Sequence, residues 1–143
     1  MATKEVNEVK EVEEVKETAA RAGPVKNYGD LLVYKQGYRL ALEVSKLSKR
    51  FPREEQFELG RQLWRSARSV PANIVEGWTK RNSAAEFKRH LLIAAGDVAE
   101  CSFWIELSAD EGISEKIAAR QLIENYSKLG FMIHKLWKEW RKL

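Results

Sequence analysis

Apolar residues recur at spacings of three and four in successive stretches of the chain, which is the pattern of helices with one buried face. The first stretch predicts a helix over residues 30–50 that ends before Pro52. A second helix is predicted to begin at Pro52 and to run to Trp78, with a kink at Pro71. The apolar stripes of these two helices are Leu40, Val44, Leu47 and Phe51, then Leu59, Leu63, Ala67, Val70 and Ile74.

Two further helices follow. The stretch from Ser83 to Glu86 is a capping-box pattern and predicts the start of the third helix, which Gly112 is expected to close. Ser114 is the predicted cap of the fourth. Their apolar stripes are Phe87, Leu91, Ala94, Val98 and Ile105, then Leu122, Tyr126, Leu129, Ile133, Leu136 and Trp140. No window alternates as a strand would, so residues 28–143 are predicted to form an all-α, antiparallel up-down four-helix bundle.

Residues 1–27 differ from the rest of the chain. The valines of this segment stand strictly three residues apart, at Val6, Val9, Val12 and Val15. At about 100° per residue such a spacing winds around a helix, so the valines build no continuous stripe. We therefore expect an N-terminal charged arm, mobile or marginally helical, that ends at the breaker Gly23-Pro24.

Charge and hydropathy narrow the classes of function. The net charge of +4 divides into −1 for residues 1–27 and +5 for the remainder, which permits an anionic partner without requiring one. The apolar runs are far shorter than the ~20 residues of a membrane span, and the first residues are too charged for a signal peptide. We expect a cytoplasmic protein without a membrane partner.

Catalytic and metal sites are poorly supported. Cys101, His90 and His134 give too few ligands for a zinc site, and Cys101 lies among apolar neighbours where a buried thiol is expected. The Glu-x-x-His pairs of di-iron bundles are missing, as is a phosphate-binding Gly-rich loop before Lys and Ser or Thr. The sequence predicts a protein that is not an enzyme and that has no cofactor, no metal and no catalytic residues.

The second predicted helix has a polar band in addition to the one apolar stripe that a monomeric bundle requires. Beside its apolar stripe runs a polar band, which consists of Glu58, Gln62, Arg65, Ser69, Asn73 and Glu76. The band is either a recognition surface or a hydrogen-bonded seam between helices or protomers. Asn73, two residues after Pro71, is also placed to satisfy backbone groups that the proline frees. We expect this helix to meet another protomer.

Residues 65–77, with the sequence RSARSVPANIVEG, resemble the signature of the four-helix-bundle proteins encoded in 23S rRNA intervening sequences. Residues 51–55 and 86–100 match the same pattern, and the resemblance extends over about residues 34–137. Asp97 stands where the family usually has Ser, and Val75 where it often has Ala.

The resemblance implies a ring-like homopentamer with no known enzymatic activity. It also points to a related branch, the accessory proteins of diversity-generating retroelements, which bind nucleic acid and a reverse transcriptase through a basic pentameric barrel. The residues expected to have a structural role, or to lie at the seam between protomers, are Gln62, Ser69, Pro71, Asn73, Glu76 and Gly77.

The candidate nucleic-acid contacts are basic residues of two kinds. Three share a face of the second predicted helix and four stand near helix ends: Arg61, Arg65 and Arg68, then Lys80, Arg81, Lys88 and Arg89. Any one of them taken alone is more simply a solubilising charge, but fivefold repetition would make a multivalent surface for RNA or DNA phosphates. Trp137 and Trp140 are expected in the core or an interface, with base stacking as the alternative. The other function considered is a structural adaptor that binds a protein, such as a reverse transcriptase, without nucleic acid.

Overall fold

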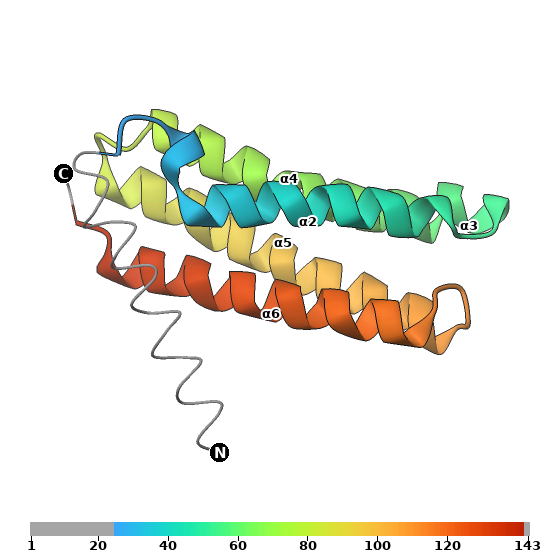
Figure 1. The fold of residues 1–143 in the computed structure, drawn as a ribbon. Helices are drawn as coiled ribbons and strands as arrows, with labels where there is room; N and C mark the ends of the chain where they lie inside the picture. Colours follow the sequence, from blue (N-terminus) through green and yellow to red (C-terminus); the bar gives the residue numbers. More distant parts are fainter. Residues whose placement is uncertain (1–24, 142–143) are drawn as a thin grey trace, which may run out of the picture.

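The computed structural model describes residues 25–141, and every structural statement below concerns that part of the chain. A 3-10 helix, η1, spans Tyr28–Asp30, and α-helices follow it with short connections (Figure 1). Their bounds are Leu32–Lys49 for α2, Arg53–Phe57 for α3, Leu59–Thr79 for α4, Ala84–Asp110 for α5 and Lys116–Glu139 for α6. The predicted arm, residues 1–27, lies almost entirely outside the described residues.

The four long helices form an antiparallel up-down bundle, as predicted (Figure 1). α4 packs closely on α5 and on α2, and α5 packs on α6. α2 and α6 lie side by side at the front of Figure 1 but contact one another much less. The bundle is therefore most open along the line between its first and last long helices.

The core consists of the apolar stripes that the helical periodicity predicts. The stripe residues of all four long helices are buried, and Tyr126, Phe87, Leu40 and Leu63 are among the largest side chains that solvent does not reach. At one end of the bundle Trp140 packs edge-on against Phe87 with ring centroids 4.5 Å apart. Burying a stripe on each helix is what holds such a bundle together.

The prediction of one continuous helix from Pro52 to Trp78 is wrong, because the helix breaks at Glu58 into α3 and α4. Glu58 has φ −96° and ψ −88°, outside the helical region. The side-chain amide of Gln56 donates to the carbonyls of Lys49 and Phe51, which ties α3 back to the end of α2. Gly60 follows two residues after Glu58, and a Cβ there would lie 3.2 Å from the Glu55 carbonyl of α3. α4 then runs through Pro71 as one helix.

Two helix starts also differ from the sequence-based expectation. α2 begins at Leu32, not at residue 30, because Asn27 and Asp30 cap each other's backbone and close the separate turn η1. α6 is capped by Glu115, whose carboxylate accepts from the amides of Ile117 and Ala118. Ser114, the predicted cap, instead shares a 2.8 Å hydrogen bond with Ser108.

The start and end of α5 follow the prediction. The Ser83 hydroxyl accepts from the Glu86 amide at 3.3 Å. Gly112 has φ +74°, the left-handed conformation that glycine adopts at little cost. Among the helices of residues 25–141, none is both long enough and apolar enough to cross a membrane.

Candidate functional site

A chain of polar side chains runs between α4 and α5, and we call Ser69, Asn73, His90 and Asp97 the α4–α5 seam. The Ser69 hydroxyl donates to the Asp97 carboxylate at 2.6 Å. The Asn73 side-chain amide donates to both the carbonyl and the hydroxyl oxygen of Ser69 at 3.0 Å. These bonds direct the Asn73 carbonyl oxygen toward His90 Nδ1, which lies 3.1 Å away.

His90 is a buried histidine, with a relative exposure of 3%, and its ring lies between Asn73 and two cations. The Lys80 ammonium and the Arg89 guanidinium each lie 3.3 Å from His90 Nε2. Because lysine and arginine can only donate, Nε2 is the accepting nitrogen and Nδ1 carries the hydrogen that is donated to Asn73. The seam thus fixes both the ring and its tautomer, and it ends in a pair of converging cations.

Asp97 begins the seam at its other end, and the environment disfavours its charged form. Burial raises the pKa of the Asp97 carboxyl and the nearby Glu100 adds to the rise, while the hydrogen bond from Ser69 opposes it. Asp97 is partly exposed. The Asp97 carboxylate accepts the hydrogen bond from Ser69, and its partial burial carries a desolvation cost.

Other residues of the predicted polar band lie in different surroundings. Gln62 and Arg65 are exposed on α4, and exposed Glu76 pairs with Lys80 at 3.4 Å. Pro71 is buried, and Gly77 lies against His90 and Phe87 of α5. The α4–α5 seam therefore uses Ser69 and Asn73 of the band together with His90 and Asp97, which the periodicity of α4 alone did not indicate.

Four of the predicted nucleic-acid contacts lie at one end of the bundle, where α4 ends and α5 begins. These residues, which we call the basic end, are Lys80, Arg81, Lys88 and Arg89. The Arg81 guanidinium lies over the Trp78 ring, 4.2 Å from its centroid, and donates to the Trp78 carbonyl. Lys88 approaches the Trp137 ring to 5.5 Å. Aromatic faces and the seam thus position the basic end.

The remaining predicted contacts lie farther along α4, toward the other end of the bundle. The Arg68 guanidinium lies over the Trp64 ring, 3.1 Å from its centroid. Arg61 lines a hollow of about 270 Å³ together with Trp64 and Phe57, whose exposures are 39% and 59%. Roughly 1.5 Å of rise per residue separates Arg68 from Lys80 by about 18 Å, so the seven candidates do not form one cluster.

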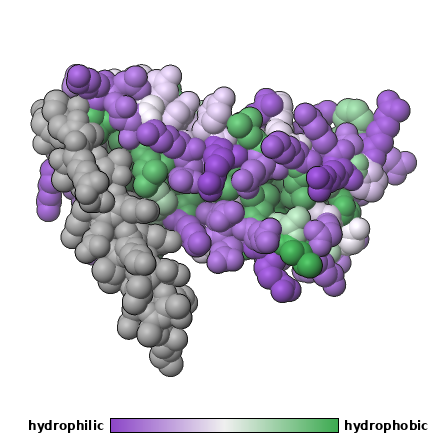
Figure 2. Space-filling view, in the orientation of Figure 1, coloured by the Kyte–Doolittle hydropathy of each residue, from purple (hydrophilic) through white to green (hydrophobic). Residues whose placement is uncertain are grey.

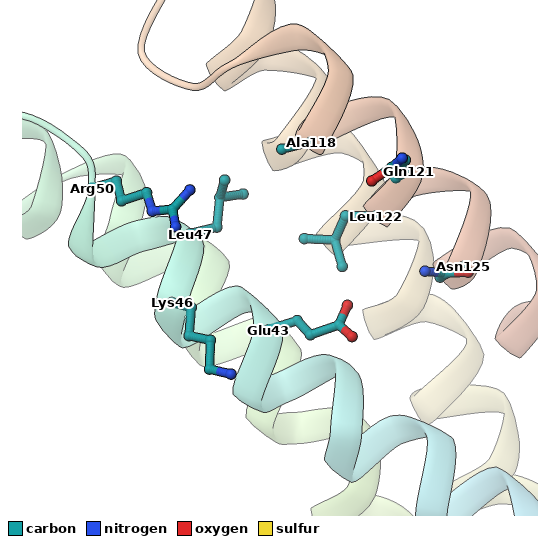
Figure 3. A pocket seen from close by; sticks show the side chains of 8 residues that line it. All are labelled: Glu43, Lys46, Leu47, Arg50, Ala118, Gln121, Leu122 and Asn125. Carbon is teal, nitrogen blue, oxygen red and sulfur yellow. The ribbon is translucent and has the colours of Figure 1, made fainter.

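A second hollow, which the sequence did not reveal, lies between α2 and α6. Hydrophobic side chains show along the line between these helices in Figure 2, and Figure 3 shows Leu47 and Leu122 facing one another there. The hollow has a volume of about 350 Å³. Its rim is polar and carries Glu43, Lys46, Arg50, Gln121 and Asn125 (Figure 3).

Two residues considered for chemistry are enclosed by the core. Cys101 is buried, and burial raises the pKa of its thiol to about 11, so the thiolate nucleophile is scarce at neutral pH. Trp140, considered for base stacking, is also buried, and that alternative is wrong because its ring packs on Trp78 and Phe87. Within residues 25–141 no three His, Cys, Asp or Glu side chains gather as metal ligands.

Comparison with known proteins agrees with this fold. The chain is similar to a protein of unknown function from the S23 ribosomal protein family of Bacteroides thetaiotaomicron, with a TM-score of 0.69 and 22% sequence identity. The similarity covers 75% of this chain and 99% of that one. No curated protein matches the sequence. The sequence profile of the 23S rRNA-intervening sequence proteins matches residues 29–135, which include the seam, the basic end and all of α2, α4 and α5. The chain belongs to the 23S rRNA-intervening sequence protein family.

Proposed function

We propose that this protein is a non-enzymatic, homo-oligomeric helical module that binds nucleic-acid phosphates through its basic end. The observation that carries the proposal is the approach of the Lys80 ammonium and the Arg89 guanidinium to the same nitrogen of His90. Because both cations approach one atom, they lie near each other and repel, and an anion that contacts both relieves the repulsion. A phosphate oxygen is the anion that such an arrangement of donors fits.

The surroundings of these cations support backbone binding without base readout. Glu76 and Glu86 lie beside Lys80 and Arg89, but both ion pairs are solvent-exposed and contribute little. Arg81 and Lys88 extend the positive surface to either side. A set of cations on rigid helix ends can follow a phosphate chain, whereas sequence recognition would need side chains that reach base edges.

Self-association would multiply this surface. The resemblance described above implies a homopentamer, and five copies of a weak phosphate site act together if the nucleic acid spans them. Light scattering at micromolar concentration should then give a mass near five times 16.5 kDa. A monodisperse species of one chain mass would contradict the oligomeric part of the proposal.

Fluorescence anisotropy with single-stranded RNA, structured RNA and duplex DNA at several salt concentrations tests the nucleic-acid part. Replacement of Lys80 and Arg89 together by Gln should weaken binding of every sequence alike. For single strands it should flatten the slope of log affinity against log salt by about 1.4, since each lost contact removes about 0.7. The matched control is Lys116→Gln with Lys128→Gln, which removes the same charge from exposed positions on α6.

Equal loss in both double variants would assign the effect to net charge and contradict a site at the basic end. Failure of the wild-type oligomer to bind any of the three nucleic acids at low salt would contradict nucleic-acid binding altogether.

The adaptor function remains the second candidate, and the hollow beside Phe57 and Trp64 favours it. Phe57 of α3 and Trp64 of α4 both have exposed aromatic side chains and line the same hollow. Aromatic residues and arginine are both enriched in protein interfaces. Replacement of Phe57 by Ser should then abolish capture of a protein partner and leave nucleic-acid affinity unchanged.

A further inference from the structure

α5 is apolar on two faces, although only one of them meets the core. On its outward face the side chains of Leu92, Ile93 and Phe103 are 45%, 39% and 54% exposed. Large apolar side chains that gather on an exposed face mark an interaction surface. Among residues 25–141, nothing covers these side chains on the outward face of α5.

The spacing on this outward face is that of a helix-packing stripe. Leu92, Gly96, Ala99 and Phe103 follow one another at intervals of four, three and four, which brings them onto one side of the helix. A glycine inside a helix costs roughly 0.5–1 kcal/mol relative to alanine. A Cβ on Gly96 would meet no atom of residues 25–141 within 4 Å, so no contact among these residues explains the glycine. A gap at Gly96 and Ala99, between two large apolar residues, instead fits a side chain that enters from outside.

α2 presents an outward row that matches this stripe. Tyr38 and Leu42, one turn apart, are 53% and 52% exposed. Tyr34 packs on Tyr38 with ring centroids 6.0 Å apart, which gives the row a stiff aromatic end. Farther along, Lys46 and Lys49 are exposed.

We infer that the outward face of α5 packs against the outward face of α2 of a second copy of this chain. The inference rests on the proposed self-association and names its surface. Leu42 of one copy would enter the gap at Ala99 of the next, with Tyr38 near Gly96. In a parallel alignment Lys49, seven residues after Leu42, comes level with Glu106, seven residues after Ala99.

Charge selects both the partner and the direction. The C-terminal half of the α5 stripe is bordered by Glu100, Glu106 and Asp110, whereas the α2 row is bordered by Lys46 and Lys49. In the antiparallel alignment Lys49 would move to the level of Leu92, near Lys88 and Arg89, where like charges repel.

The parallel direction also agrees with the topology of the bundle. α2 and α5 run in the same direction within the protomer, because the chain reverses twice between them, once from α2 to α4 and once from α4 to α5 (Figure 1). Rotation about an axis along the bundle keeps these directions, so copies related by such an axis bring α5 of one parallel to α2 of the next. A contact between two different surfaces closes into a ring when the rotation closes.

Disulfide trapping tests this contact directly. In a Cys101→Ala background, the variant with Leu42→Cys and Ala99→Cys should form covalent dimers and larger species on mild oxidation. Either single variant alone should stay monomeric on a denaturing gel. The matched control, Gly96→Cys with Ala99→Cys, places both thiols on α5 and should not cross-link copies.

Charge reversal gives an independent readout in solution. Lys46→Glu with Lys49→Glu should raise the concentration of half-dissociation, measured by light scattering, at least tenfold. Glu106→Lys with Asp110→Lys should do the same, and all four changes in one chain should restore assembly. Lys116→Glu with Lys128→Glu on α6 is the control and should leave assembly unchanged.

Gly96→Leu separates packing from folding. Since the site is open, the variant should keep its circular dichroism and melting temperature as a dilute protomer and lose assembly. If the oligomer is intact but positions 42 and 99 do not cross-link, or if the control thiols at 96 and 99 link two copies, the α5–α2 contact is overturned and self-association is not. A monomeric wild type overturns both the contact and self-association. None of these results affects the anisotropy measurement of nucleic-acid binding.

Discussion

Gly77 and His90 mark the closest approach of α4 to α5, because a Cβ placed on Gly77 would lie 2.7 Å from the Cβ of His90. It would also lie 3.1 Å from the Phe87 ring. These atoms are the base of a side chain and a buried ring, neither of which can move aside cheaply. The glycine therefore permits the spacing that lets Asn73 reach His90.

We expect Gly77→Ala to destabilise the protein by about 1–3 kcal/mol, the usual cost of overpacking, although alanine is the better helix former. Urea unfolding followed by circular dichroism measures the change. The matched control is Gly96→Ala, where the added methyl group meets no atom and the dilute protomer should be unchanged or more stable by up to about 1 kcal/mol. Equal effects of the two substitutions would contradict the close approach at Gly77.

Removal of the Asn73 side chain should cost more than removal of the Ser69 hydroxyl. Ser69→Ala leaves Asp97 partly solvated, and we expect a loss of about 1 kcal/mol. Asn73→Ala strips the buried His90 Nδ1–H of its acceptor, and we expect about 1–3 kcal/mol. Chemical denaturation provides the free energies of unfolding, with exposed Gln62→Ala on the same helix as the control. If both substitutions left stability and assembly unchanged, Ser69 and Asn73 would return to the recognition-surface hypothesis.

The pKa of Asp97, raised by burial, predicts how stability depends on pH. A raised folded-state pKa means that the folded protein holds the proton more tightly than the unfolded chain. This contribution to stability is fully present below the unfolded-state pKa and is lost as pH rises through the folded-state pKa. The melting temperature of Asp97→Asn minus that of the wild type should therefore increase as pH rises from about 3 to about 7. Exposed Glu139→Gln on α6 controls for the change in net charge, and equal pH profiles for the two variants would contradict the effect.

The bundle was predictable from the sequence because its signal is repeated in every helix. Leu63, Val70 and Ile74 carry the core stripe of α4, and one wrong position among so many would not change the result. The break at Glu58 was not predictable in this way. It accompanies hydrogen bonds from the Gln56 amide to the carbonyls of Lys49 and Phe51, which precede α3, and no local propensity encodes these contacts.

The candidate site was predictable only on α4. The polar band indicated Ser69 and Asn73, but their partners Asp97 and His90 lie 28 and 17 residues away and become neighbours only when α5 packs on α4. In the sequence, His90 stands at the edge of the apolar stripe of α5, so its pattern did not indicate a polar partner for Asn73. One signal was available in the sequence: Gly77 on the α5-facing side of α4 marks a place where two helices approach closely.

The thiol of Cys101 should be protected from reagents in the folded protein. The residue has no solvent-exposed surface, and burial raises the pKa of its thiol to about 11. Both the access of a reagent and the fraction of reactive thiolate are therefore low at pH 8. Reaction with a thiol-specific reagent such as dithionitrobenzoate should follow the opening of the fold and should accelerate when urea raises the unfolded population.

The control is Thr79→Cys, which adds a second thiol at an exposed position at the end of α4. Its labelling should show one fast phase and one slow phase, the slow phase matching wild-type Cys101. The slow phase should also quicken in any variant that destabilises the α4–α5 seam, Gly77→Ala above all, since Cys101 lies beside Ser66 on the inner sides of the same two helices. Fast labelling of wild-type Cys101 in native buffer would contradict its burial and would reopen its role as a reactive thiol.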